Sequence, residues 1–301
     1  MSKTTTNLLG IIITILAGTY FFITCCSECG TEQKVEPVKE AIVPAESEAT
    51  SLPFAFSDGD FTYSANDNFN FNASSSTILE PVSQGVEEGI ISLGSFLNDN
   101  MDKVININGY YTNEEENDSA FPNLGLARAN SVKNYFVSKG IPSRFINTMG
   151  KLMGELVPDG NVFQGPLGFS LANRAEDADE RLIELYNKIK EDPLVLEFNT
   201  AETSINLSAV QRQKFADISR YLDKSEDAIA QVVGHTDNTG DRAANIKLGQ
   251  ERADFAKAYL MGNGISENKI NATSKGPDEP IASNNTEEGK AKNRRTVITL
   301  N

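Results

Sequence analysis

The fold is decided by one stretch of the sequence, IAQVVGHTDNTG at residues 229–240, and by the pattern that follows it. Residues 229–234 are mostly apolar and predict a strand, and the polar residues after them, ending in Gly240, predict a turn. From about Asn245 to Met261, apolar residues recur every three or four positions, which predicts an amphipathic helix. A strand, a polar loop and a helix in this order indicate an α/β unit.

Further elements extend this unit in both directions. Residues 194–198 alternate between apolar and polar side chains and predict a strand, and a helical pattern begins at Ser208. Two more strands are expected at residues 270–274 and 296–300. The resulting order, strand–helix–strand–helix–strand–strand, predicts an α/β layer in which a single sheet carries its helices on one face.

One residue interrupts the apolar stripe of the helix at 245–261. Arg252 lies four positions after Leu248 and three before Phe255, so its side chain points into the stripe. A guanidinium there is costly unless it is hydrogen-bonded to an anion. An internal salt bridge, or an arginine whose head reaches the rim, would account for it. Alternatively, an exposed Asp237 in the loop after the strand and a half-buried Arg252 would together hold an ammonium and a carboxylate of one small molecule.

These residues resemble the OmpA-like peptidoglycan-binding domain family. The resemblance runs over about residues 194–301, and its spacing holds from the first predicted strand to the last. The matching positions are Gly234-His235-Thr236-Asp237-Asn238-Thr239-Gly240, Asn245, Leu248, Glu251-Arg252-Ala253, Gly276, Pro280, Asn284, Thr286, Gly289 and Asn293-Arg294-Arg295.

The resemblance implies that the chain binds peptidoglycan non-covalently, without catalysis and without a cofactor. In this family, the residues matched by Asp237 and Arg252 hold the free amine and the carboxylate of diaminopimelate in peptidoglycan stem peptides. Asn245 and Arg294 match further ligand-contacting positions, and Thr236 lies beside Asp237 in the same loop.

An internal repeat organises the rest of the chain. A shift of 124 residues aligns residues 112–147 with residues 236–271 without a gap, and twelve of the 36 pairs are identical. The identical pairs include Gly125 with Gly249 and Arg128 with Arg252, which accidental similarity of two helices does not explain. We therefore expect two tandem OmpA-like β-α-β-α-β-β domains, residues 52–190 and residues 191–301, with a boundary near residues 191–193.

The first copy departs from the family pattern and is interpreted as a degenerate member that binds diaminopimelate weakly or not at all. The gapless alignment places Asn113 at the position of Asp237, and Glu114-Glu115-Glu116 replaces the Asn-Thr-Gly turn. We interpret this acidic run as a solvated loop. Asp179-Glu180-Arg181 weakly echoes the run at residues 293–295, and the Phe- and Tyr-rich residues 54–71 predict strands that form core.

The N-terminal segments indicate where the chain is located. Residues 8–26 are almost wholly apolar and long enough to cross a bilayer, so residues 1–30 are either an uncleaved membrane anchor or a lipoprotein-type signal with an acylated Cys25 or Cys26. Residues 31–51 are acidic and rich in proline and predict a flexible tether. The bulk of the chain is then expected in the bacterial cell envelope, facing the periplasm, although the pattern does not say which membrane holds it.

Composition excludes several classes of protein. Lys and Arg number 27 against 42 Asp and Glu, a net charge of −15 that argues against a nucleic-acid partner. His235 is the only histidine, which excludes metal sites built from several histidines and catalysis by two of them. The three cysteines all lie at residues 25–29, so no disulfide joins parts of the globular region.

Two functions remain, and two others are remote. The first is a non-catalytic envelope protein that tethers the membrane to the wall through the second copy. The alternative is an interaction protein whose first copy recruits another envelope protein, with wall binding secondary. A flagellar-stator-like channel subunit needs an acid in its membrane segment, and residues 8–26 contain none. A wall-cleaving enzyme is equally remote because no nucleophile with a base stands at diagnostic spacing and nothing in the sequence singles out a pair of acids.

Overall fold

The computed structural model describes residue 16, residues 19–20, residues 48–262 and residues 264–301. The chain divides into a first unit, Met1–Ser47, and a second unit, Glu48–Asn301. In the first unit, Leu16, Thr19 and Tyr20 are helical, and the Thr19 hydroxyl donates to the Leu16 carbonyl at 3.2 Å. No helix among the described residues is both long and apolar enough to cross a bilayer. The predicted anchor therefore lies mostly outside the described residues, as does the predicted tether up to residue 47.

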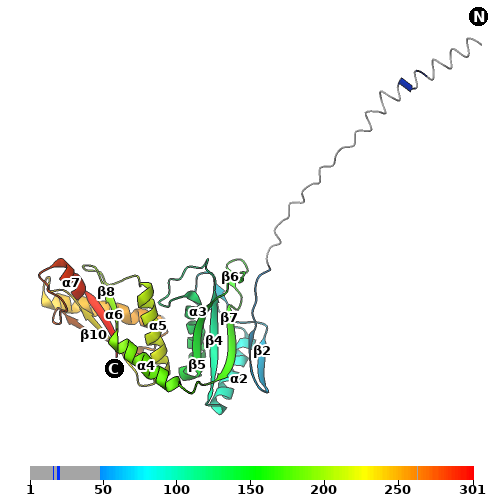
Figure 1. Ribbon diagram of the computed structural model, residues 1–301, viewed down its shortest axis with the longest axis horizontal. Helices are drawn as coiled ribbons and strands as arrows, with labels where there is room; N and C mark the ends of the chain where they lie inside the picture. The colour runs from blue at the N-terminus through cyan, green and yellow to red at the C-terminus, as the bar shows by residue number, and fades with distance from the viewer. Residues whose placement is uncertain (1–15, 17–18, 21–47, 263) are drawn as a thin grey trace, which may run out of the picture. The chain divides into compact units, whose positions relative to one another are not determined.

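The C-terminal half of the second unit is a four-stranded sheet with helices (Figure 1). Its elements are β8 (Leu194–Glu197), α5 (Ala209–Lys224), β9 (Ala230–His235), α6 (Arg242–Gly262), η3 (Glu267–Lys269), β10 (Ile270–Gly276), α7 (Glu287–Asn293) and β11 (Arg295–Leu300). The central strand β9 pairs parallel with β10 and antiparallel with β11, and β8 pairs with the far edge of β11. The mixed α/β fold predicted for this half is confirmed.

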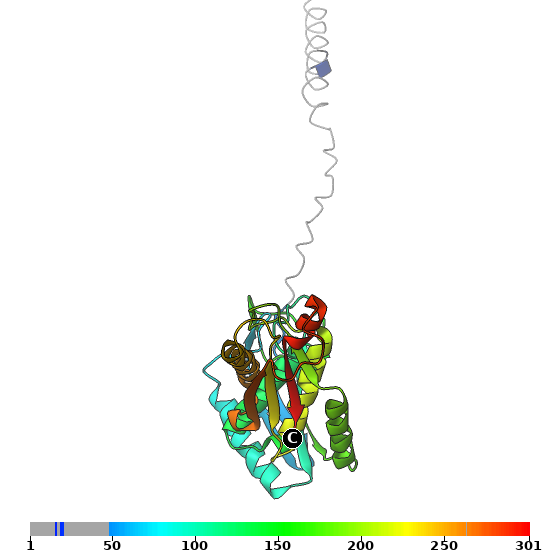
Figure 2. The same cartoon turned by 90° about the vertical axis from the view of Figure 1, so that its left-hand side faces the viewer.

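Alternation along the strands explains which face of this sheet is covered. Ala230 and Val232 of β9 are buried with Leu194 and Leu196 of β8 in one core, while the residues between them are less buried. Both α5 and α6 contribute apolar side chains to that core, so they cover the same face. Figure 2 shows β11 in front with the short helix α7 at its beginning. Helix α7 was not predicted from the sequence, because it is only 7 residues long; it follows the N-cap residue Thr286.

The N-terminal half of the second unit repeats only part of this strand arrangement. Its elements are β1 (Phe54–Asp58), β2 (Phe61–Ala65), β3 (Phe71–Asn72), α2 (Gln84–Asp99), β4 (Lys103–Tyr111), α3 (Leu124–Ser138), η2 (Ser143–Phe145), β5 (Ile146–Leu152), β6 (Val162–Phe163), β7 (Leu167–Asn173) and α4 (Ala178–Glu191). Its strands form three sheets, β1–β2, β3–β6 and β5–β4–β7, so the single sheet predicted for this copy is wrong. Here β4 lies between parallel β5 and antiparallel β7, as β9 lies between parallel β10 and antiparallel β11. The Phe- and Tyr-rich lead-in forms the hairpin β1–β2 and strand β3, and Phe54, Phe56, Phe69 and Phe71 are core residues, as predicted.

The strand pairing shows that the repeat is not gapless. Ile105 of β4 pairs with Ile146, and Ala230 of β9 pairs with Ile270. Ile146 and Ile270 are 124 residues apart, whereas Ile105 and Ala230 are 125 apart. The first half therefore has one extra residue between its central strand and the helix that follows. Thr112, and not Asn113, stands at the position of Asp237.

The predicted correspondence between residues 293–295 and Asp179-Glu180-Arg181 is also wrong. Leu167 pairs with Gly109 in the first half, and Thr296 pairs with Gly234 in the second. This register places Gly165 at the position of Arg294, whereas residues 179–181 lie in α4, beyond the sheet. Charge similarity alone misled the comparison of these two runs.

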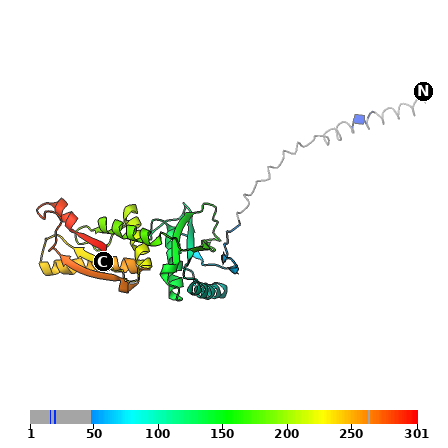
Figure 3. The same cartoon turned by 60° about the horizontal axis from the view of Figure 1, so that its bottom comes forward.

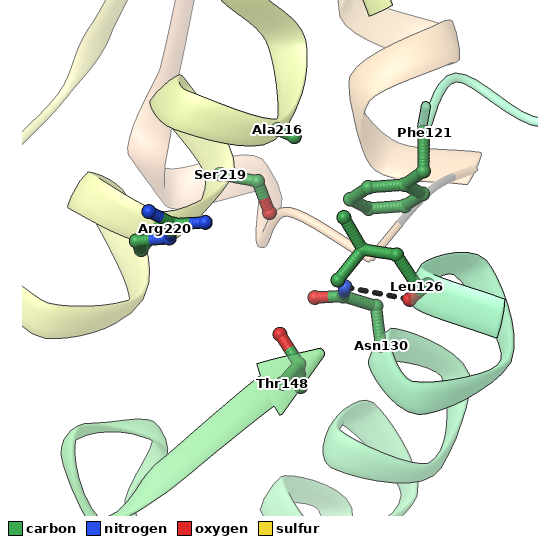
Figure 4. Close-up of a pocket in the computed structure, with 7 residues that line it drawn as sticks. All are labelled: Phe121, Leu126, Asn130, Thr148, Ala216, Ser219 and Arg220. Carbon is green, nitrogen blue, oxygen red and sulfur yellow. Dashed lines mark hydrogen bonds between the residues drawn. The ribbon is translucent and has the colours of Figure 1, made fainter. Parts of the chain in front are cut away.

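The two halves share core residues. Ala120, Phe121, Leu124 and Ala127 of the first half belong to the core of the second, and the Phe121 and Phe215 rings meet edge to face at 5.2 Å. Helices α4 and α5 lie between the two sheets in Figures 1 and 3. Figure 4 shows a small pocket at this junction, where Phe121 and Asn130 face Ser219 and Arg220 of α5.

The junction also contains polar contacts. The Nζ of Lys133, a buried residue of α3, lies 2.5 Å from the Asp223 carboxylate of α5. The Ser143 hydroxyl donates to the Asp223 carbonyl at 2.7 Å. At the other end of the first half, Thr50 N–H donates to the Val157 carbonyl at 2.8 Å, so the last residues of the predicted tether are joined to the folded part.

Candidate functional site

A close approach of backbones positions helix α6 against strand β9. A Cβ on Gly234 would lie 1.8 Å from the carbonyl oxygen of Gly249, so only glycine allows this contact. Arg252 comes one turn after Gly249 and is thereby held beneath the end of β9 and the loop that follows it. The carboxyl end of a central strand is where such sheets place ligand-binding loops.

Arg252 is fully buried, and its hydrogen bonds go to backbone carbonyls. Nε donates to Glu202 at 2.9 Å, Nη1 to His235 at 3.1 Å and Nη2 to Asn199 at 3.1 Å. The Phe198 ring lies 5.1 Å from the guanidinium carbon. A guanidinium has five N–H donors, so among the described residues two donors, one on each terminal nitrogen, remain for a further acceptor.

Asp237 is buried next to this arginine and is itself ion-paired. Its Oδ2 accepts from Arg294 Nη1 at 2.9 Å, and its Oδ1 accepts from the Thr239 N–H at 2.8 Å. Burial alone would raise the pKa of Asp237, but the hydrogen bonds from Arg294 and Thr239 outweigh it and hold that pKa below its ordinary value. Asp237 is therefore an anion at neutral pH.

From the sequence we expected an exposed Asp237 and a half-buried Arg252, and both expectations are wrong. Asp237 is only 6% exposed and Arg252 is 0% exposed. Arg294, immediately before β11, pairs with Asp237, while three backbone carbonyl groups and the Phe198 ring enclose Arg252. The three charges influence one another, because burial and then Arg294 lower the pKa of Arg252 to about 10, while Asp237 raises it. Two cations and one anion thus meet at this end of the sheet.

The remaining predicted residues support the loop. Thr236 is buried, and its hydroxyl donates to the Asp237 carbonyl at 2.8 Å. Asn245, in the first turn of α6, donates to the Thr239 carbonyl at 3.0 Å. All five predicted site residues therefore lie at one end of the C-terminal sheet or in the loop between β9 and α6.

Sequence reasoning missed the loop after β8, which supplies two of the three carbonyl groups bound by Arg252. Every residue carries a carbonyl, so no side-chain pattern marks Asn199 or Glu202 as partners. The buried imidazole of His235 has no hydrogen-bond partner at Nδ1 among the described residues. Its contribution to the site is its backbone carbonyl. The described residues also contain no group of three His, Cys, Asp or Glu that could hold a metal ion.

Arg128 of the first half has the same surroundings as Arg252. It is fully buried, and its Nε, Nη1 and Nη2 donate to the carbonyl oxygens of Ser75, Tyr110 and Asn72 at 3.0, 3.0 and 3.3 Å. The Phe71 ring lies 5.4 Å from its guanidinium carbon. Each of these contacts has its counterpart around Arg252, in the same order of donor atoms.

The difference between the two arginines is Glu115. Its carboxylate binds Arg128 with both oxygens, Oε1 to Nη2 at 2.5 Å and Oε2 to Nη1 at 3.1 Å. The side chain of Glu115 is only 3% exposed, so the interpretation of residues 114–116 as a solvated loop is wrong for Glu115, although Glu114 and Glu116 are exposed. Arg128 therefore forms an internal salt bridge. Such a salt bridge was one of the two explanations that the sequence left open for Arg252 in the apolar stripe.

Comparison with known proteins gives the relatives of this chain. The model of the OmpA family matches residues 70–158 and residues 198–294. The probable lipoprotein YiaD of Escherichia coli (strain K12) is 48% identical over 69 residues, which are 23% of this chain and 32% of YiaD. The peptidoglycan-associated lipoprotein of Buchnera aphidicola subsp. Baizongia pistaciae (strain Bp) is 32% identical over 129 residues, which are 42% of this chain and 70% of that protein.

Other comparisons cover shorter parts. The chain spans 36% of the outer membrane protein A of Bordetella avium, with 50% identity over 69 residues. It thus covers about a third of that protein and of YiaD. Among solved structures, the peptidoglycan-associated lipoprotein from Burkholderia pseudomallei matches 36% of this chain and 89% of its own, with 25% identity and a TM-score of 0.33.

Proposed function

This chain belongs to the OmpA family, and we propose that its second half, residues 191–301, binds peptidoglycan without catalysing a reaction. The relatives support this role through their names, among them a peptidoglycan-associated lipoprotein and the peptidoglycan-binding protein ArfA of Mycobacterium tuberculosis (strain CDC 1551 / Oshkosh). The match to the family model covers both halves, which supports two tandem copies of one domain with a boundary near residues 191–193.

The observation that carries the proposal is the environment of Arg252. Its guanidinium is fully buried, and three of its N–H donors are occupied by carbonyl groups. Arg128, in the same environment, uses its two remaining donors to bind a carboxylate. Arg252 is therefore suited to a carboxylate bound with both oxygens, which is the strong geometry for an arginine.

The ligand that we infer is the diaminopimelate residue of a stem peptide. Its free carboxylate would bind Arg252, and its free ammonium would bind Asp237. Asp237 keeps its negative charge at neutral pH because Arg294 and Thr239 donate to it. Arg294, which pairs with Asp237 and lowers the pKa of Arg252, would add a second cation near the carboxylate. Asn245 and Thr236 fix the loop that carries Asp237.

We further propose that the chain tethers a membrane to the wall. The relatives include envelope lipoproteins and outer membrane proteins, which supports a location in the cell envelope with the folded part facing the periplasm. The membrane attachment would be supplied by residues 1–30 and the reach by residues 31–49. Whether those residues form an uncleaved helix or an acylated lipoprotein N-terminus is decided by the mass of the mature N-terminal peptide.

Sedimentation of the full chain with purified sacculi tests the proposal. Arg252→Lys keeps the positive charge but not the forked donor geometry, and Asp237→Asn keeps the shape of the side chain but not its charge. We expect each substitution to weaken sacculus binding more than about tenfold, since a charge-assisted hydrogen bond contributes about 1.5–3 kcal/mol. Lys247→Ala, an exposed substitution on the same helix, is the matched control.

Two outcomes would contradict the proposal. If both variants fold, as judged by circular dichroism, and sediment like the unsubstituted chain, Arg252 and Asp237 do not hold the ligand. If sacculi that carry lysine in place of diaminopimelate bind as well as the diaminopimelate type, the ligand is not the zwitterionic end of diaminopimelate, because lysine lacks the distal carboxylate.

A further inference from the structure

The loop at residues 112–117 inserts a carboxylate into the first half at a position built for one. Each oxygen of Glu115 accepts two hydrogen bonds. Oε1 accepts from Arg128 Nη2 at 2.5 Å and from the Ser74 N–H at 3.1 Å. Oε2 accepts from Arg128 Nη1 at 3.1 Å and from the Thr112 N–H at 3.0 Å. A forked cation and two backbone donors thus surround one carboxylate, which is the arrangement of a binding site for an anion.

The backbone of this site is the same in both halves. Ser74 and Ala201 are the two non-glycine residues with positive φ among the described residues, at 58° and 62°. Each lies three positions after the phenylalanine that packs on its arginine, Phe71 and Phe198 respectively. A left-handed conformation is unfavourable for a residue with a Cβ and is kept where the surroundings require it. In the first half, this conformation aims the Ser74 N–H at Glu115.

Glu115, which occupies this site, belongs to the loop at residues 112–117 and not to the parts of the site that both halves share. The three carbonyl groups and the positive-φ residue recur in both halves, and the second half has Thr239 and Gly240 in the loop where the first half has its acidic run. The one extra residue between strand and helix also lies in this segment. Glu115 is therefore an addition to a site that exists without it.

We propose that the first half retains a carboxylate-binding site at Arg128 and that Glu115 is its intramolecular ligand. The site accepts the carboxylate of a small organic acid once the Glu115 side chain is removed. It does not take diaminopimelate, because Thr112 stands where the second half has Asp237, and a threonine offers no charge to an ammonium. The inference concerns the first half and does not require that Arg252 bind the wall.

Chemical rescue of Glu115→Ala tests this inference. The substitution removes a CH₂–COO⁻ group, which acetate replaces almost atom for atom. Removing one partner of a buried ion pair leaves the other charge uncompensated, so we expect the Tm of the full chain in detergent to fall by about 10 °C. Sodium acetate should restore most of that loss in a saturable way, and sodium chloride at the same ionic strength should not.

Two matched variants accompany the measurement. Glu114→Ala removes an exposed neighbouring carboxylate and should neither lower the Tm nor respond to acetate. Glu115→Gln removes the charge but leaves the side chain in place, so its Tm should fall without recovery in acetate. If Glu115→Ala does not fold in chloride, recovery of its circular dichroism spectrum in acetate is the expected result.

Three results would overturn the inference: a Tm of Glu115→Ala equal to that of the unsubstituted chain, equal effects of acetate and chloride, or an unfolded variant that acetate does not recover. The measurement uses no peptidoglycan. It can therefore fail while sacculus binding depends on Arg252, or succeed while sacculus binding does not.

Discussion

At the residue scale, the chain contains two buried arginines in equivalent surroundings, one in each half. Arg128 and Arg252 have equivalent carbonyl partners and equivalent phenylalanine neighbours, and they differ in whether the chain supplies a carboxylate. The cost of burying Arg252 is seen in its pKa, which burial and then the nearby Arg294 lower to about 10. It still carries its charge at neutral pH, so an anion that reaches it meets a cation in a poorly solvated place, where an ion pair is stronger than at the surface.

His235 provides a pH prediction at this scale. Burial and then Arg295 lower the pKa of its imidazole from 6.5 to about 4. Between those values the unfolded chain binds a proton that the folded chain does not, so His235 should make the free energy of unfolding fall as the pH decreases from 6.5 to 4. Because it is the only histidine, one imidazole resonance followed by NMR reports its titration directly.

The matching variant is His235→Gln, which keeps the backbone carbonyl that Arg252 needs. The difference in unfolding free energy between the two chains should depend on pH over this range. A resonance that titrates near pH 6.5 in the folded chain would contradict the prediction.

At the element scale, the site depends on how closely α6 lies on β9. The two backbones meet at Gly234 and Gly249, and the guanidinium of Arg252 reaches the end of the strand because of that contact. The first half makes the same contact between Gly109 and Gly125, although α3 begins only at Leu124, two residues after Pro122. The glycine pair, rather than the length of the helix, positions the arginine.

Gly234→Ala should therefore separate the helix from the strand. The added Cβ would lie 1.8 Å from a backbone oxygen, which a side-chain movement cannot relieve. We expect a loss of about 1–3 kcal/mol in the free energy of unfolding, measured by urea titration, together with weaker sacculus binding. The control is Gly262→Ala at the end of α6, where an added Cβ meets nothing within 4 Å. Equal stability of the two variants would show that the close approach is dispensable.

Much of the secondary structure of the second half, and part of its site, could be predicted from the sequence. The strands of the second half, its two long helices α5 and α6, the repeat and the position of Arg252 follow from periodicity and from an arginine in an apolar stripe, whereas the short helix α7 does not. The pairing of Glu115 with Arg128 could not be predicted, because it depends on the path of a loop. The one-residue shift of the repeat was hidden because the aligned stretch begins at Thr112, after β4 has ended, and therefore contains no residue of the central strand.

At the scale of the whole molecule, the two halves are joined by shared apolar residues. Phe121 lies in a loop of the first half and packs on Phe215 of the second, and Lys133 pairs with Asp223 across the same junction. The sequence predicted two copies and a boundary between them, but not this sharing, because Phe121 was compared only with Asn245. Its burial follows from the shortened helix α3, which leaves room for the loop to turn toward α5.

Phe121→Ala tests how strongly the halves depend on each other. Removal of a fully packed phenylalanine costs about 3–5 kcal/mol, and here the loss should lower the stability of both halves in one calorimetric transition. Hydrogen exchange of β9, in the half that does not contain the substitution, should become faster. Met149→Ala, at an exposed position, is the control. Unchanged exchange in β9 would show that the halves unfold independently.

The attachment of Thr50 and Ser51 to the folded part has a mechanical consequence. In a chain held at a membrane by one end and at the wall by Arg252, tension enters through the pairing of residues 50–52 with Val157 and Gln164. It leaves through helix α6. Because these points lie in different halves, the load crosses the junction between them, where the packing of Phe121 and the contacts of Lys133 lie beside the covalent connection from α4 to β8. The first half would then transmit tension from the tether to the second half without binding the wall itself.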